Sequence, residues 1–270
     1  MRASQKPQVS VIMSVHNGMP YLKEAVKSIL SQTYKNFEFI IVDDASTDKS
    51  LKYLKSVHDK RIKLIKNSKN LGLATSLNKA LKVAKGEYIA RMDADDISLP
   101  KRLETQLNFL IKNPKVDLCG SWAELINEEG RTVGEKKYPK NDKEIKKALG
   151  WYPPLIHPTW LARTEFYEKT KGYDIRFDMA EDYELLVRAK EKFQMANIGQ
   201  KLLLWRLGNK RRSRQHFRQM DLTDLRIKRK ALQKGYFGRL YILTVIKKTL
   251  MVYLIPLPIK VRIAKFLKVA

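Results

Sequence analysis

Apolar runs that suit buried strands alternate with amphipathic segments along the first half of the chain. Strands are predicted where short, β-branched apolar runs occur, at Val9–Val15, Phe37–Val42, Arg61–Ile65 and Tyr88–Met92. Helices are predicted where apolar residues recur at helical spacing, beginning near Pro20, at Ser46 or Asp48, at Ala74 and near Pro100. Alternation of this kind is typical of a parallel sheet with right-handed crossover connections. We therefore expect an α/β fold in which helices flank a mostly parallel sheet.

The pattern is less regular in the second half of the chain. We expect residues Val116–Leu125 to return to the sheet and residues Glu181–Lys192 to form a helix. Between them, Trp151–Thr159 is rich in proline and aromatic residues, which predicts a stiff loop.

The chain changes character at about Arg206. From there to its end it is strongly basic, and residues Gly235–Ile259 are rich in aliphatic and aromatic side chains. The uninterrupted apolar runs are far shorter than the ~18 residues that a membrane span needs, and lysines and prolines interrupt them. We therefore predict two parts: a domain over residues 1–205 and a basic, amphipathic, helical tail over residues 206–270 that lies on a membrane surface.

The composition excludes several classes of protein. The sequence has 270 residues, of which 44% are hydrophobic and 30% charged, which provides for a core and excludes general disorder. A single cysteine, Cys119, excludes a disulfide scaffold and a cysteine-based zinc site. The polar start of the chain contains no secretory signal, so we expect the protein to reside in the cytoplasm.

The charge of the chain is positive and unevenly distributed. The formal net charge is +26, and residues 201–270 hold 19 Lys and Arg against two acidic residues, a net charge of +17. Such a basic excess predicts a polyanionic partner, either nucleic acid or an anionic membrane surface. Composition alone does not choose between the two.

Polar residues gather where three of the predicted strands end. These short segments are Ser14–Gly18, Asp43–Asp48 and Asp93–Asp96. Because ligands of such sheets bind at the carboxyl ends of the strands, we expect the three segments to line one cleft. Asp93 and Asp95 are two residues apart, and a pair of carboxylates with this spacing suits Mg²⁺ or Mn²⁺, which prefer oxygen ligands. The alternative is that they are turn residues, with Asp96 or Ser98 capping the next helix.

Five motifs follow one another in a fixed order along the chain. They are Val9–Gly18, Ser28–Asp48, Asn70–Ala74, Lys85–Asp96 and Glu181–Leu185. Together they resemble the motifs of glycosyltransferase family 2, over about residues 8–205. Any one of them alone would be a weak signal, whereas several in register are specific.

The resemblance implies a GT-A fold, a Rossmann-like domain that binds a nucleotide-sugar, and an inverting, metal-dependent sugar transfer. Carried over by position, Asp44 holds the nucleobase of the donor, Asp93 contacts the ribose or the water shell of the metal, and Asp95 ligates Mn²⁺ or Mg²⁺. Asp182 is then the general base that takes the proton from the acceptor hydroxyl. The alternative for Asp182 is a favourable negative charge at a helix N-terminus.

The chain departs from the family pattern at some positions. Ser14 stands where the family usually has proline and His16 where it often has tyrosine, and we expect both to face the nucleobase. Processive members carry a Gln-x-x-Arg-Trp signature, but here Gln219 follows Gln215–Arg218. The resemblance therefore favours a transferase that adds a single sugar over a polymer synthase.

The acceptor is expected to bind near the aromatic loop. Trp151 and His157 lie in the segment where such enzymes receive the acceptor, and Glu181 precedes the expected base. We predict that these three residues contact the acceptor sugar. Packing within the loop is the alternative for Trp151 and His157.

Two functions from different classes fit the sequence. The first is a hexosyltransferase that moves a sugar, from UDP-hexose or UDP-N-acetylhexosamine by family default, to a glycan or lipid-linked acceptor in bacterial surface-polysaccharide synthesis. Its basic tail would hold it to the anionic inner face of the cytoplasmic membrane. The second is a nucleic-acid- or membrane-binding scaffold with an inactive transferase fold, in which Tyr236, Phe237 and Tyr241 stack on bases. The intact carboxylates favour the enzyme, for which we expect no nucleic-acid partner.

Overall fold

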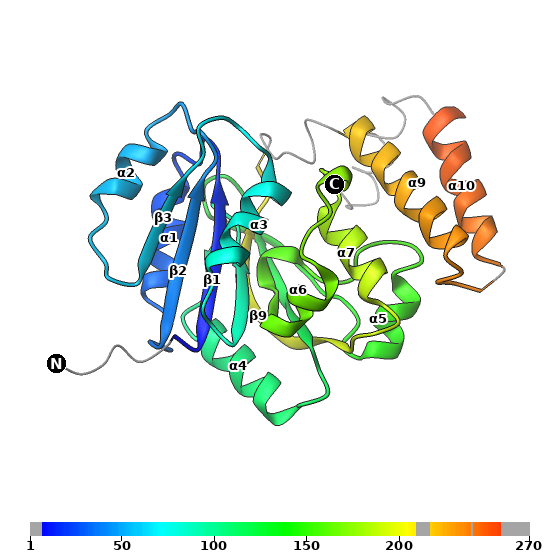
Figure 1. Cartoon of the computed structure of the whole chain (residues 1–270), viewed down its shortest axis with the longest axis horizontal. Helices are drawn as coiled ribbons and strands as arrows, with labels where there is room; N and C mark the ends of the chain where they lie inside the picture. The colour runs from blue at the N-terminus through cyan, green and yellow to red at the C-terminus, as the bar shows by residue number, and fades with distance from the viewer. Residues whose placement is uncertain (1–6, 209–216, 239, 255–270) are drawn as a thin grey trace.

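The computed structural model describes residues 7–208, 217–238 and 240–254, which are built around one sheet (Figure 1). Within these residues the sheet has nine strands in the order β3-β2-β1-β4-β8-β6-β9-β5, with β7 paired to β6. Its first four strands run parallel: β1 (Val9–Val15), β2 (Phe37–Asp43), β3 (Ile62–Lys66) and β4 (Tyr88–Met92). The predicted parallel arrangement is confirmed for this half of the sheet.

The second half of the sheet is mixed. Its strands are β5 (Ile97–Ser98), β6 (Leu118–Ile126), β7 (Thr132–Lys136), β8 (Leu161–Arg163) and β9 (Met195–Arg206). Strand β8 is antiparallel to β4 and β6, whereas β9 is parallel to β6 and antiparallel to β5. The strand expected near residues 116–125 is confirmed as β6. The apolar pattern does not predict β9, because exposed residues 199–201 interrupt it where the register with β6 shifts.

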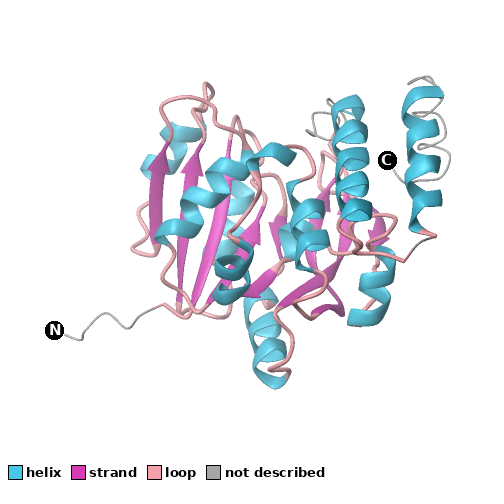
Figure 2. Ribbon diagram, turned by 45° about the vertical axis from the view of Figure 1, so that its right-hand side comes forward, coloured by secondary structure: helices cyan, strands magenta, loops and turns pink. Residues whose placement is uncertain are grey.

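Helices cover both faces of the sheet and close two hydrophobic cores (Figures 1 and 2). Side chains of β1 alternate between the cores, with Ile12 in one and Val11 and Met13 in the other. The core of Val11 is closed mainly by α1 (Leu22–Leu30), α2 (Ser50–Ser56) and α4 (Arg102–Lys112). The core of Ile12 is closed mainly by α3 (Leu73–Val83), α5 (Asp142–Ala148), α6 (Thr164–Thr170) and α7 (Glu181–Ala189).

The predicted helices are present, with small shifts at their ends. Asp48 accepts a hydrogen bond from the backbone N–H of Ser50 at 2.8 Å. The N-cap of α2 is nevertheless Lys49, without a side-chain cap hydrogen bond, so the helix starts later than the expected Ser46 or Asp48. The helix expected from Glu181 is α7, which ends at Ala189. The predicted aromatic loop ends in a short 3-10 helix, η1 (His157–Thr159), and a second one, η2 (Ile175–Phe177), precedes α7.

Two helices follow the sheet and lie side by side, α9 (Phe217–Gln233) and α10 (Tyr241–Leu254) (Figures 1 and 2). They bury Leu225 and Ile227 of α9 and Val245 of α10 in the same core as α3, α6 and α7. Among the described residues, none of the helices is both long enough and apolar enough to cross a membrane. The expected helical character of the tail is present in these two helices, while the basic run at 210–214 lies outside the described residues.

We predict that Gly86→Ala lowers the free energy of unfolding by about 1–3 kcal/mol, because the chain passes too close to β1 for a side chain. A Cβ at position 86 would lie 2.5 Å from the backbone nitrogen of Ser10 and 2.8 Å from the carbonyl carbon of Val9. The measurement is urea denaturation followed by circular dichroism. Gly238→Ala is the control, because a Cβ there has no atom within 4 Å; equal losses in both variants would contradict the close approach.

Candidate active site

A cavity of about 1050 Å³ opens at the carboxyl ends of β1, β2 and β4. The three polar segments that the sequence singles out all contribute to it. Eight of the predicted site residues line it: Ser14, His16, Asp44, Asp93, Asp95, His157, Glu181 and Asp182. The expected meeting of strand ends at one cleft is therefore present. Trp151 does not line this cavity, and it is 56% exposed.

Three carboxylates form a compact cluster where β4 ends. One oxygen from each of Asp93, Asp95 and Asp96 lies within 4.8 Å of the others. Neither Asp96 nor Ser98 caps the next helix, because the N-cap of α4 is Lys101 and no side chain makes a cap hydrogen bond there. The capping alternative is thus wrong, and the cluster offers the all-oxygen ligands that Mg²⁺ and Mn²⁺ prefer.

Arg206, at the end of β9, binds the loop that bears these three carboxylates. Its backbone N–H donates to Asp96 Oδ1 at 2.9 Å, and its Nε donates to the carbonyl oxygen of Asp95 at 2.9 Å. Its Nη2 pairs with Glu24 of α1 at 2.6 Å. Sequence reasoning missed this role because it depends on the pairing of β9 with β5 and β6, for which the chain carries no local signal.

Asp44 is buried and organises a neighbouring loop. Its Oδ1 accepts hydrogen bonds from Asn67 Nδ2 at 2.7 Å and from the backbone N–H of Leu71 at 2.8 Å. Its Oδ2 accepts from the backbone N–H of Gly72, also at 2.8 Å. Asp44 therefore fixes the loop before α3, a role that the sequence does not reveal. His16 lies beside it, with Nδ1 2.8 Å from the Asp44 carbonyl oxygen.

Asp182 lies in the first turn of α7, at the edge of the same cavity. Burial raises the pKa of its carboxyl group, and the nearby Asp93 carboxylate raises it further. The backbone N–H of Tyr183, at 2.7 Å, and the charge of Arg91 lower the pKa in part. A carboxylate with a raised pKa is a stronger base, so the local environment suits proton abstraction.

His157 and its chain neighbours Ile156 and Pro158 form another wall of the cavity. The imidazole is buried, and its Nε2 lies 2.8 Å from the Tyr173 hydroxyl. Burial lowers the pKa of His157 well below its ordinary value, and the charge of Arg91 lowers it further, so the ring is neutral near pH 7. Tyr138 and Trp205 also line the cavity. The sequence does not single out these two aromatic residues. They lie in the cavity lining, where Trp151 was expected to contact the acceptor sugar.

The chain is similar to known glycosyltransferases in sequence. The family model described as "Glycosyl transferase family 2" matches residues 10–170. A glycosyltransferase of Methanocaldococcus jannaschii, MJ1057, is 40% identical over 211 residues, which are 76% of this chain and 72% of that protein. The O-antigen biosynthesis glycosyltransferase WbnJ of Escherichia coli is 37% identical over 210 residues, covering 75% of this chain and 80% of that protein.

Solved glycosyltransferase structures share its fold. TarS 1-349 of S. aureus in complex with UDP-GlcNAc aligns with a TM-score of 0.65 at 20% identity, over 82% of this chain and 65% of that one. The chain spans 39% of a longer TarS structure. The mannosyltransferase PcManGT of Pyrobaculum calidifontis, in complex with GDP-Man and Mn²⁺, aligns with a TM-score of 0.63 at 19% identity, over 92% of this chain and 70% of that one. The expected GT-A fold is thereby confirmed.

We predict that Asp44→Asn lowers the free energy of unfolding by about 1–3 kcal/mol, because an amide nitrogen in place of one carboxylate oxygen no longer accepts a loop N–H and points its own hydrogens at it. Urea denaturation measures the change. Glu129→Gln is the control, because the Glu129 side chain is 60% exposed. Unchanged stability in Asp44→Asn, together with weaker nucleotide binding, would show that Asp44 serves the ligand alone.

Proposed function

Because the chain belongs to glycosyltransferase family 2, we propose that it moves a single hexose or N-acetylhexosamine from a UDP-sugar to a hydroxyl group of a glycan or lipid-linked acceptor. The observation that carries this proposal is that Asp44, Asp93, Asp95 and Asp182 line one cavity. UDP-GlcNAc is the ligand named for the similar TarS structure, and WbnJ is named for O-antigen biosynthesis. The first name supports a UDP-sugar donor, and the second supports a role in the synthesis of a bacterial surface polysaccharide.

The donor would lie across the ends of β1, β2 and β4. Ser14, His16 and Asp44 would contact the nucleobase, and Asp93 the ribose or the metal's water shell. Asp44 already accepts three N–H groups, which leaves room for a further donor on a carboxylate with about four acceptor positions. The base would therefore bind beside the loop that Asp44 fixes.

Asp95, with Asp93, would hold Mn²⁺ or Mg²⁺. The oxygen-only character of the cluster fits either ion, and Mn²⁺ is named for the similar PcManGT structure. Such an ion, when bound, neutralises the charge of the departing nucleoside diphosphate. Arg206 would keep the Asp95 backbone in place, since its guanidinium binds that carbonyl oxygen.

Asp182 would act as the general base. It accepts the proton of the acceptor hydroxyl while that oxygen forms a bond to the anomeric carbon of the donor sugar. The bond from this carbon to the diphosphate oxygen breaks on the opposite face, with the electron pair leaving on the diphosphate, so the configuration inverts. One carboxylate is sufficient for such a reaction, and the raised pKa of Asp182 favours it for this role.

The acceptor would enter on the side of Glu181 and His157, with Tyr138 and Trp205 offering aromatic surfaces for a sugar ring. Trp151 would contribute only to a longer acceptor, because it lies outside the cavity lining.

The alternative of a scaffold that stacks nucleic-acid bases is less well supported. Tyr241 is only 7% exposed, and its ring stacks on Phe237 with centroids 4.3 Å apart.

We further propose that α10 holds the enzyme to the anionic inner face of the cytoplasmic membrane. One side of α10 packs on α9, whereas its other side exposes a row of large apolar side chains: Ile242, Leu243, Ile246, Leu250, Tyr253 and Leu254. An exposed apolar row of this size marks an interaction surface. The net charge of +26 opposes pairing with a second copy and favours a surface that is both apolar and anionic, as a bilayer is.

We predict metal-dependent turnover of one donor from a panel of nucleotide-sugars, measured as release of nucleoside diphosphate with Mn²⁺ or with EDTA. Asp95→Ala should abolish the release. Asp182→Asn should lower it by about 10²- to 10⁴-fold while UDP still binds, because only the proton acceptor is lost. Glu165→Ala, which changes a 58%-exposed carboxylate, is the control. Failure of the wild-type protein to bind UDP or GDP with Mn²⁺ would contradict the proposed function.

We predict that full-length protein co-sediments with vesicles of phosphatidylglycerol and phosphatidylcholine, and less with phosphatidylcholine alone. A double variant, Ile246→Glu with Leu250→Glu, should bind at least about tenfold more weakly, because two side chains no longer bury apolar surface. The control is Ile111→Glu with Val133→Glu, two residues that are 52% and 55% exposed elsewhere. Equal binding of both double variants would refute the membrane role. So would a wild-type dimer in solution that the α10 variant converts to a monomer.

A further inference from the structure

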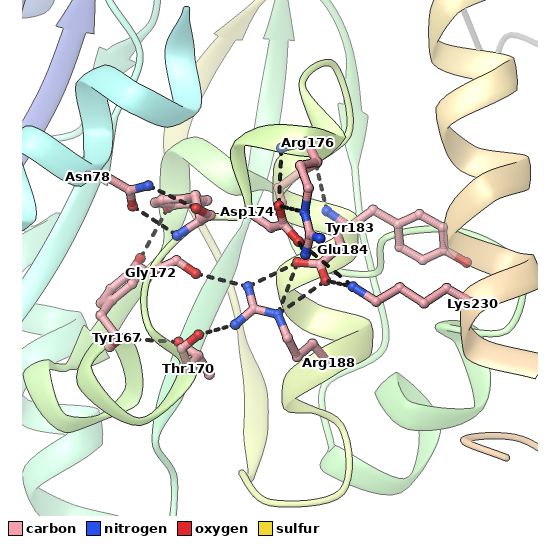
Figure 3. Close-up of polar contacts among 12 residues, drawn as sticks. Asn78, Tyr167, Thr170, Gly172, Asp174, Arg176, Tyr183, Glu184, Arg188 and Lys230 are labelled. Carbon is pink, nitrogen blue, oxygen red and sulfur yellow. Dashed lines mark hydrogen bonds and ion pairs between the residues drawn. The ribbon is translucent and has the colours of Figure 1, made fainter. Parts of the chain in front are cut away.

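Two lysines of α9 bind the residues that directly follow Asp182 in α7. Lys228 Nζ donates a hydrogen bond to the Tyr183 hydroxyl at 2.9 Å and another to the carbonyl oxygen of Trp151 at 3.1 Å. Lys230 Nζ pairs with Glu184 Oε1 at 2.9 Å, as Figure 3 shows. Consecutive residues of the first turn of α7 are therefore each held by α9.

The Lys228 contacts and the Glu184 carboxylate are buried, whereas the Lys230 side chain is 35% exposed. The side chains of Lys228 and Glu184 are each 3% exposed, and Tyr183 is 2% exposed. The Tyr183 hydroxyl also donates to the carbonyl oxygen of Leu149 at 2.7 Å, directly after α5. Because leaving a buried polar group without its partner is unfavourable, such contacts resist rotation of the helical turn that bears them.

Arg188 ties the same turn to the segment before it (Figure 3). Its guanidinium binds both oxygens of Glu184 and donates to the carbonyl oxygens of Gly172, at 2.9 Å, and Thr170. Glu184 is thus fixed from two directions, by Arg188 of its own helix and by Lys230 of α9. The opposite end of α9 reaches the cavity itself, since Met220 is one of its lining residues.

We propose that Lys228 and Lys230 are positioning residues, through which α9 fixes the first turn of α7 and aims the Asp182 carboxylate at the acceptor. This inference rests on the proposed function, in which Asp182 is the base. Neither lysine touches the reacting atoms. They act through Tyr183 and Glu184, whose backbone continues directly from that of Asp182.

Each lysine can be replaced without leaving a buried carboxylate unpaired. Without Lys230, Glu184 keeps its pair with Arg188 at 2.9 Å. Without Lys228, Asp224 keeps its pair with Lys248 at 2.7 Å. Methionine fills a similar volume, so Lys228→Met and Lys230→Met are variants that should still fold. Exposed Lys234, on the turn after α9, provides the matched control Lys234→Met.

The test uses full-length protein and Mn²⁺-dependent hydrolysis of UDP-N-acetylglucosamine, or of whichever donor the panel identifies, with water as the acceptor. We expect kcat to fall about tenfold in each single variant and further in the double variant, because a misplaced base slows the reaction. The KM for the donor and the Kd for UDP with Mn²⁺ should stay within about twofold of wild type. Lys230→Arg should restore kcat, and Lys234→Met should match the wild type.

A second measurement tests, without catalysis, whether Lys228 and Lys230 hold the first turn of α7 in place. Hydrogen–deuterium exchange of the amides of residues 183–186 should be at least about tenfold faster in the double variant than in wild type, because opening of the turn is no longer opposed. Unchanged exchange, or a kcat equal to that of Lys234→Met, would overturn the proposal. Equal losses of kcat and UDP affinity would also overturn it, because they indicate general damage. Absence of UDP and GDP binding in the wild type would instead count against the proposed function.

Discussion

Crowding of negative charge at one edge of the sheet is the constraint on which the rest of the site depends. Carboxylates that share a cavity repel one another, and burial makes an uncompensated charge costly by several kcal/mol. Arg91 meets this requirement directly, because its buried guanidinium pairs with Asp93 at 2.5 Å. Burial lowers the pKa of Arg91, but the charge and hydrogen bond of Asp93, together with Tyr173 and Asp96, raise it by more in sum, so the guanidinium stays charged. Its charge also reaches Asp182, where it limits the rise of the pKa that burial causes.

The parts of the fold that the sequence predicts are those with a local cause. Period-two and period-3.6 apolar patterns are properties of neighbouring residues, so β1 to β4 and the helices between them follow from the chain directly. Strand β9 is different, because its place depends on pairing with β6, whose Cα partners lie about 80 residues earlier in the chain. Strand β8 has three residues and no room for a pattern. Long-range pairing of this kind leaves no periodic trace.

The candidate site divides in the same way. Asp44, Asp93, Asp95 and Asp182 stand out because they lie at strand ends and a helix start within motifs that follow one another in a fixed order, and all four line the cavity. The residues that hold the site in place do not stand out. Arg206 and Lys228 look like members of a basic tail until the structure shows both side chains nearly buried, each 3% exposed. Charge counted along the sequence cannot separate a lysine that faces solvent from one that neutralises a buried anion.

The burial of α9 has a consequence for the construction of chimeras between this protein and its relatives. The family model ends at residue 170, before α7 begins. A domain boundary drawn at the end of that match therefore places α7 and α9 in the segment that would be exchanged with a relative. Leu225, Ile227 and Ala231 of α9 belong to the same core as Leu185 and Leu186 of α7. A chimera that replaces one helix without the other would pack together two helix surfaces from different proteins. Chimeras with relatives should therefore exchange α7 and α9 together.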